Sequence, residues 1–202
     1  MSKRHSFLDK RLGRLDDTRL IVKGLIHPET TIFANKDALC VGRQNRLFTI
    51  AGDSSLNFRP IIASENTGVE GSDTVDVFNG VAYFLAKDGV YAWDSSGIRC
   101  VSDGKVRAWF TTDTYFNRAR FQYAVGRVDQ LRNRYRLLLA NTGDSTENRW
   151  VEFDITSGEW WGPHKTDAFT PSFQMSILDS NSLAIPAICS TSGFVYKEQA
   201  TR

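Results

Sequence analysis

The densest group of basic side chains after the N-terminal segment consists of six arginines within one short stretch. They are Arg118, Arg120, Arg127, Arg132, Arg134 and Arg136. Arg134 and Arg136 alternate with Tyr135 and Leu137, so in a β-strand the two arginines share one face. Such a face is either solvated, or it pairs with another subunit or with phosphate. We therefore take Arg134 and Arg136 as candidate contacts to a subunit or to DNA.

A second basic group lies at the start of the chain, where residues 1–24 hold seven basic side chains against three acidic ones. The candidate contact residues there are Lys3, Arg4, Lys10, Arg11 and Arg14. One interpretation is a solvated arm or peripheral strand. The other is a basic arm that lies on an acidic neighbour or on phosphate.

The residue types that usually carry catalysis or bind metals are scattered. The three histidines lie in unrelated segments, and no CxxC, P-loop, GxGxxG or GxSxG motif occurs. Cys40, Cys100 and Cys189 are flanked by apolar residues, which predicts buried free thiols. Aspartates in turns are expected to bond their own backbone, with a glycan-cleaving pair among them as the alternative. We predict no catalytic residues, no metal and no cofactor, and the chain is not expected to be an enzyme.

The elements that must position these residues are clearest between Val75 and Val101. Four short apolar segments alternate there with tight turns at Asn79-Gly80, Asp88-Gly89 and 94–97. Asn-Gly is typical of a type I′ hairpin, whose central residues need positive φ, and we expect the same backbone at Gly89. Four strands in under thirty residues predict an antiparallel meander of the size of one propeller blade.

Similar hairpins recur along the chain and predict an all-β fold. Val41-Gly42-Arg43 resembles Val125-Gly126-Arg127, and both precede further strands. We predict a β-propeller-like array of about four short antiparallel blades over residues 31–202, with a β-sandwich as the alternative. Residues 1–30 are expected to form an irregular basic N-terminal arm or peripheral segment.

One short helix is predicted after residue 102, since Val106, Trp109 and Phe110 fall on one helical face. No apolar run is long enough for a membrane-spanning helix.

The run from Val77 to Asp94, followed by the segment 98–102 and the short helix, resembles the propeller repeat of tailed-bacteriophage neck and tail proteins. These are the nozzle, or tail tubular protein B, and the head-closure hub proteins. The segments 133–137 and 151–160 are similar to the following repeat of that group. The resemblance covers about residues 35–165, and nozzle proteins are usually much longer than this chain.

The resemblance implies a structural role in the virion. The protein would form a homo-oligomeric ring, commonly six-fold, around the channel through which DNA leaves the particle. Its partners would be other copies of itself and the portal, adaptor or other tail proteins, with DNA passing through the lumen non-specifically. It would be synthesised in the host cytoplasm and would reside in the neck or tail. The alternative is a receptor- or carbohydrate-binding propeller module of a tail or a cell surface, in which tryptophans stack on sugar rings.

Overall fold

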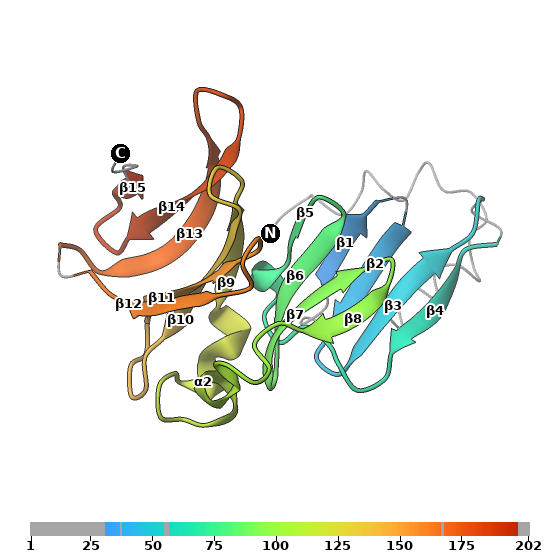
Figure 1. The fold of residues 1–202 in the computed structure, drawn as a ribbon, viewed down its shortest axis with the longest axis horizontal. Coiled ribbons are helices and arrows are strands. Elements are labelled where there is room, and N and C mark those ends of the chain that lie inside the picture. The colour runs from blue at the N-terminus through green and yellow to red at the C-terminus, as the bar shows by residue number, and fades with distance from the viewer. Residues whose placement is uncertain (1–30, 37, 55–56, 167, 198–202) are drawn as a thin grey trace, which may run out of the picture.

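A computed structural model describes residues 31–36, 38–54, 57–166 and 168–197, so the predicted N-terminal arm (1–30) lies outside the described residues. The described chain forms four small antiparallel sheets, each a meander of strands in chain order (Figure 1). Sheet 1 contains β1 (Thr31–Asn35), β2 (Ala38–Arg43), β3 (Arg46–Ala51) and β4 (Arg59–Ser64). Sheet 2 contains β5 (Asp76–Phe78), β6 (Val81–Ala86), β7 (Gly89–Asp94) and β8 (Gly97–Cys100).

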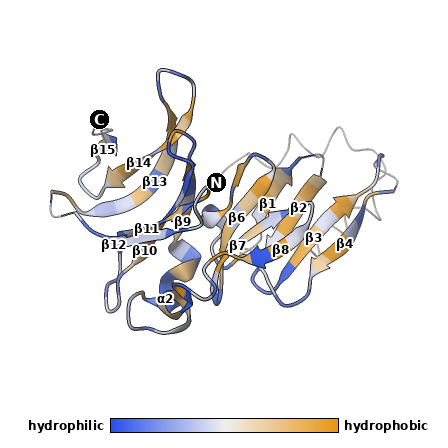
Figure 2. Ribbon diagram, viewed as in Figure 1, coloured by the Kyte–Doolittle hydropathy of each residue, from blue (hydrophilic) through white to orange (hydrophobic). Residues whose placement is uncertain are grey.

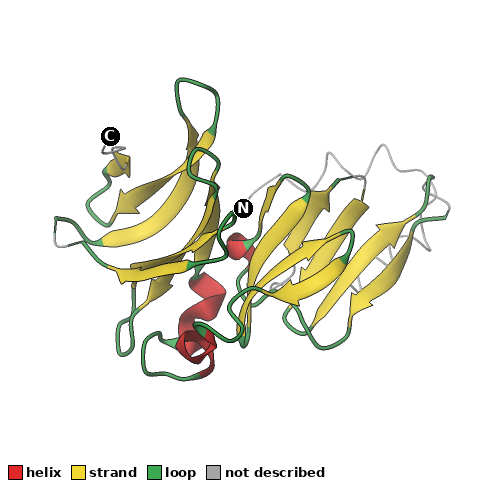
Figure 3. Ribbon diagram, in the orientation of Figure 1, coloured by secondary structure: helices red, strands yellow, loops and turns green. Residues whose placement is uncertain are grey.

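Sheet 3 contains β9 (Val125–Asp129), β10 (Arg134–Ala140), β11 (Glu147–Asp154) and β12 (Trp160–His164). Sheet 4 has three described strands, β13 (Pro171–Leu178), β14 (Ala184–Ser190) and β15 (Val195–Lys197). The sheets do not close into a barrel, and strands dominate the fold (Figure 3). The predicted all-β array of about four short antiparallel blades is confirmed.

In the part of the chain that the structure describes, helical structure is confined to the connection between sheets 2 and 3 and to one turn before β5. The predicted short helix is confirmed as α2 (Arg107–Thr111), which buries Phe110. Two 3-10 turns that the sequence did not reveal, Ser72–Thr74 and Arg118–Tyr123, flank sheet 2 in the chain.

Side chains along each strand point alternately to the two faces of its sheet, and the sheets pack face to face through these side chains. In β6, Tyr83 and Leu85 point into an apolar core shared with sheet 3, where they meet Tyr135, Leu137 and other buried groups. The intervening residues of β6, Ala82 and Phe84, belong to a second core shared with sheet 1. Sheet 2 is therefore covered on both faces, which a two-sheet sandwich does not provide.

Two glycines show why the turns of sheet 2 need this residue. Asn79 and Gly80 both have positive φ, 50° and 73°, as a type I′ hairpin requires. Gly89 has no positive φ, so the expectation for its backbone is wrong. A Cβ at Gly89 would instead lie 2.4 Å from the Ser102 hydroxyl oxygen, so glycine is needed there for close approach.

The repeated hairpins fall at different places in their sheets. The turn after Val41-Gly42-Arg43 joins the second and third strands of sheet 1, whereas the turn after Val125-Gly126-Arg127 joins the first and second strands of sheet 3. These two segments are therefore not equivalent positions of a repeat. The turns at 94–97 and 154–160, in contrast, both join the third and fourth strands of their sheets.

Candidate functional site: a charged interface between sheets 3 and 4

The two candidate arginines of β10 lie on the face of sheet 3 that points away from the apolar core. Tyr135 and Leu137 enter that core, so the alternation predicted from the sequence places Arg134 and Arg136 on the opposite face. The antiparallel register then sets Arg134 across from Asp154 and Arg136 across from Glu152 of β11. Opposite charges directly across two strands stabilise the pairing.

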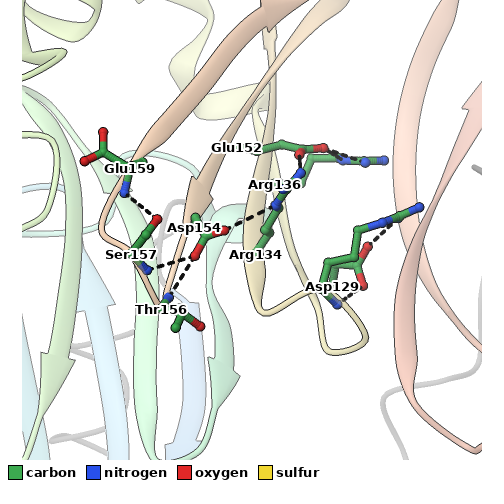
Figure 4. A network of polar contacts seen from close by, with 9 residues as sticks. Asp129, Arg134, Arg136, Glu152, Asp154, Thr156, Ser157 and Glu159 are labelled. Atoms are coloured by element: carbon green, nitrogen blue, oxygen red, sulfur yellow. Dashed lines mark hydrogen bonds and ion pairs between the residues drawn. The ribbon is translucent and has the colours of Figure 1, made fainter. Parts of the chain in front are cut away.

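Glu152 joins the two arginines. Its Oε1 accepts from Nε and Nη2 of Arg136, at 2.8 and 2.6 Å, and its Oε2 accepts from Nη1 of Arg134 at 3.0 Å (Figure 4). Asp154 lies 3.6 Å from Nε of Arg134. We call these four residues, Arg134, Arg136, Glu152 and Asp154, the arginine–carboxylate cluster. Two positive and two negative groups balance within it.

The cluster is buried to different degrees at its two ends. The side chains of Arg136 and Glu152 are 4 % and 7 % exposed, whereas that of Arg134 is 30 % exposed. Asp154, at the more open end, accepts from the backbone N–H groups of Ser157 and Thr156, and these bonds hold its carboxyl pKa below the usual value. A buried ion pair is strong only when its charged groups are well hydrogen-bonded. The Arg136–Glu152 pair is both buried and hydrogen-bonded, so it is the most firmly held part of the cluster.

Sheet 4 covers this buried end. Gln174 of β13 is fully buried, and its Nε2 donates to the backbone carbonyls of Arg136, at 2.9 Å, and Val125. A single side chain of sheet 4 thus bonds two neighbouring strands of sheet 3. Trp150 and Trp161 add ring contacts, with the guanidinium carbons of Arg136 and Arg134 at 6.0 and 5.4 Å from the respective ring centres.

A cavity of about 220 Å³ lies beside Arg136 between the two sheets. Its lining combines apolar and basic groups, namely Arg136, Trp150, Thr166, Phe169, Ile188, Tyr196 and Lys197. Phe169 and Tyr196 stack with ring centres 4.0 Å apart and form one wall. Among the described residues that line it, none carries a carboxylate side chain.

The rest of the arginine-rich stretch is also bonded within the chain. Arg120 pairs with Glu147, and Arg132 pairs with Asp129, which is 2 % exposed and closes the β9–β10 hairpin. Arg127 donates to the carbonyl of Asp73, and Arg118 to that of Lys87. The stretch therefore ties sheet 3 to its neighbours.

The structure brings together Arg134 and Arg136 from the sequence-predicted set. The other candidates, Lys3, Arg4, Lys10, Arg11 and Arg14, lie outside the described residues. Contact of Arg134 or Arg136 with another subunit or with DNA stays a prediction. Arg136 would reach another molecule only if sheet 4 moved, whereas the Arg134 side chain is partly exposed to solvent.

Sequence reasoning missed Glu152, Asp154 and Gln174. Glu152 and Asp154 alternate along β11 as the arginines do along β10, so the hairpin register could have paired them. No sequence signal marks Gln174, because its role depends on how sheet 4 packs on sheet 3.

A second, larger pocket of about 370 Å³ lies between sheets 1 and 2 at the end of β1. It is lined by Asn35, Lys36, Ala38, Cys40, Thr49, Trp93, Asp94 and Ser95. The Asn35 amide nitrogen donates to the backbone carbonyl of Trp93 at 3.1 Å, and the Asn35 oxygen is buried without a hydrogen-bond partner. Hydrogen bonds from Ser96 and Arg99 keep the pKa of Asp94 well below its usual value, so this rim carries a carboxylate.

Within the described part of the chain, no group of three or more His, Cys, Asp and Glu side chains is placed to hold a metal ion. None of the described helices has the length and apolar character needed to cross a membrane.

Comparison with known proteins gives a fold likeness and no family. No protein-family model matches the sequence, and no curated protein matches it. A similar solved structure is described as the extracellular domain of a hybrid two-component system from B. thetaiotaomicron, with a TM-score of 0.51 and 14 % identity. The match covers 85 % of this chain and 21 % of that one, so the chain spans about a fifth of that protein's length. The likeness supports the sheet array as a known fold and says nothing of activity.

Proposed function

We propose that this protein is a structural component of a bacteriophage neck or tail, which assembles with other copies of itself into a ring around the DNA exit channel. The observation that carries the proposal is the apolar surface that sheet 1 leaves exposed at one end of the sheet array. Sheet 2 is covered on both faces, whereas the outer face of sheet 1 buries Val41 and Phe48 but leaves other apolar side chains, Ile32, Leu39 and Ile62, about half exposed. Exposed apolar surface of this kind is typical of association sites.

The hydrogen bonds and ion pairs of these arginines are compatible with a channel that does not bind the passing DNA tightly. Each of the six arginines from Arg118 to Arg136 bonds a carboxylate or a carbonyl of its own chain. A phosphate would have to compete with these partners. The arginines of this stretch are therefore suited to keeping the sheets rigid rather than to binding DNA. The resemblance of the segment 77–102 to phage propeller repeats supports the virion setting.

The test is the composition of virus particles from the phage that encodes this chain. We expect mass spectrometry and imaging of purified particles to show it at a low copy number that is a multiple of three or six, placed in the neck or tail. A chain that is expressed but missing from intact particles would refute the proposal.

A second candidate, a receptor- or carbohydrate-binding module, is favoured by the pocket between sheets 1 and 2. The buried Asn35 oxygen, the Lys36 ammonium and the Asp94 carboxylate are groups that hydrogen-bond to hydroxyl-rich ligands, beside the indole of Trp93. Saturable binding of a host glycan, lost in Asn35→Ala and retained in the exposed-loop variant Ser145→Ala, would favour this function. Absence of binding by a glycan panel to the folded chain would remove it.

A further inference from the structure

The cavity between sheets 3 and 4 is lined by three separate segments of the chain. Sheet 3 contributes Arg136 and Trp150, and sheet 4 contributes Ile188 and Tyr196. The third segment is the connection between β12 and β13, which contributes Phe169. A molecule held in this cavity would therefore contact both sheets and their connection at once.

Most of the lining is apolar or aromatic. Ile188 is 6 % exposed, and Figure 2 shows apolar colouring along its strand, β14. The rings of Phe169 and Tyr196 are stacked, with an interplanar angle of 3°, and the Trp150 ring lies on the sheet 3 side. Walls of this kind are suited to a flat ring, because aromatic side chains offer large apolar surfaces to it.

Few groups of the lining can bond the hydroxyl groups of a sugar. Among the described residues that line the cavity, the uncharged hydroxyl groups are those of Thr166 and Tyr196. A hydroxyl-rich ligand would lose its hydration water here and leave most of its polar groups unpaired, which is unfavourable. The lining therefore favours a ligand with an apolar body and few polar groups.

The charged side chains of the described lining are both basic, namely Arg136 and Lys197. Glu152 is shared by Arg136 and Arg134, so one carboxylate faces two guanidinium groups at the buried end of the cluster. Asp154 balances the second arginine, but it lies at the more open end. The end beside the cavity keeps an excess of positive charge, which favours one negatively charged group on the ligand.

The volume of the cavity sets the size of the ligand. An apolar cavity of about 150 Å³ holds one benzene molecule. The cavity between sheets 3 and 4 has about 220 Å³, which leaves room for one ring and one small acidic group.

We propose that this cavity binds a small aromatic acid in its carboxylate form. The ring lies among Trp150, Phe169 and Tyr196, and the carboxylate faces Arg136. The inference goes beyond the proposed function, since assembly into a ring does not require such a ligand. Because the ligand contacts both sheets, its binding should hold sheet 4 more firmly on sheet 3.

An NMR titration of the full chain with sodium benzoate tests the site, with benzamide and acetate as matched probes. A ligand of about ten non-hydrogen atoms and ordinary efficiency binds with a Kd of about 1 mM. We expect saturable binding of benzoate, about tenfold weaker binding of benzamide, which lacks the charge, and no saturable binding of acetate, which lacks the ring. Equal affinities for benzoate and benzamide would overturn the assignment of an acid. No saturable binding of benzoate would overturn the proposal as a whole.

Two variants locate the bound benzoate, after circular dichroism has established that each is folded. Tyr196→Ala removes one wall of the cavity and should abolish saturable binding. The matched control is Tyr123→Ala in the 3-10 turn Arg118–Tyr123, where the side chain is 54 % exposed and benzoate should bind as it does to the parent. The double variant Arg136→Met/Glu152→Leu removes the buried pair of charges together and should lower the affinity for benzoate to that for benzamide. Unchanged binding to Tyr196→Ala would place benzoate elsewhere and overturn the site.

Hydrogen exchange measures whether the ligand holds sheet 4. At a benzoate concentration ten times its Kd, exchange through opening of the cavity should slow about tenfold in β13–β15. Protection of sheets 1 and 2 with no change in β13–β15 would place the molecule in the other pocket and overturn the proposal.

Discussion

Sheet 3 is packed by opposite chemistry on its two faces. Toward sheet 2 it presents Tyr135, Leu137 and Val151, all fully buried in an apolar and aromatic core. Toward sheet 4 it presents the arginine–carboxylate cluster. The apolar interface stabilises the fold by burying apolar surface area. The charged interface contributes little net stability, but it requires specific partners. The difference suggests that sheet 2 and sheet 3 form the stable centre and that sheet 4 is held by specific bonds.

The largest expected effect is at the charged interface, because removing one member of a buried ion pair is costly. Glu152→Ala leaves the Arg136 guanidinium, 4 % exposed, without its carboxylate. We expect a loss of about 3–5 kcal/mol in the free energy of unfolding. Urea denaturation followed by fluorescence measures it. The double variant Arg136→Met/Glu152→Leu should recover most of this loss, and failure to recover it would mean that the charges themselves are needed for folding.

Removal of apolar volume at the other interface should cost nearly as much. Leu137→Ala opens a cavity in the core shared by sheets 2 and 3, and we expect a loss of about 2–5 kcal/mol. The matched control is Leu131→Ala on the β9–β10 turn, where the side chain is 45 % exposed and the loss should be small. Equal losses in the two variants would contradict the assignment of Leu137 to the stable centre.

A smaller effect is expected where sheet 4 bonds sheet 3. Gln174→Met keeps the approximate volume but leaves the carbonyls of Arg136 and Val125 without this donor. We expect a loss of about 1–3 kcal/mol. Hydrogen exchange should show faster exchange confined to β13–β15, whereas uniform acceleration over all four sheets would show that sheet 4 is part of one cooperative unit.

The smallest effect concerns a carboxyl group within the apolar interface. Asp76 of β5 accepts from the backbone N–H of Val128 at 2.7 Å, and burial raises the Asp76 pKa above its usual value. Between the ordinary and the raised pKa, the folded state holds a proton that the unfolded state releases. The free energy of unfolding therefore falls as the pH rises through that window.

The variant Asp76→Asn should flatten this pH dependence, and thermal melts in buffers across the acidic range measure it. A parent protein whose stability rises with pH throughout that window, with Asp76→Asn following the same slope, would show that the Asp76 carboxyl is not the responsible group.

The sequence was sufficient to predict the local structure of this protein. Asn79-Gly80 predicts its hairpin because few residues tolerate positive φ at both turn positions. Alternation predicts that Arg134 and Arg136 share a face, since side chains in a strand point to opposite sides in turn. Both properties depend on residues that are neighbours in the chain.

The tertiary structure decided which groups meet across sheets. Gln174 bonds the carbonyl of Arg136 across 38 residues, and Tyr135 donates to the carbonyl of Thr74 across 61. Gly89 is needed because the side chain of Ser102 approaches it, and the backbone angle that its turn motif suggested is absent. The hairpins of Gly42 and Gly126 look alike but occupy different positions in their sheets. The physical reason is that strand and turn preferences act over a few residues, whereas partners across an interface are chosen by how whole sheets stack.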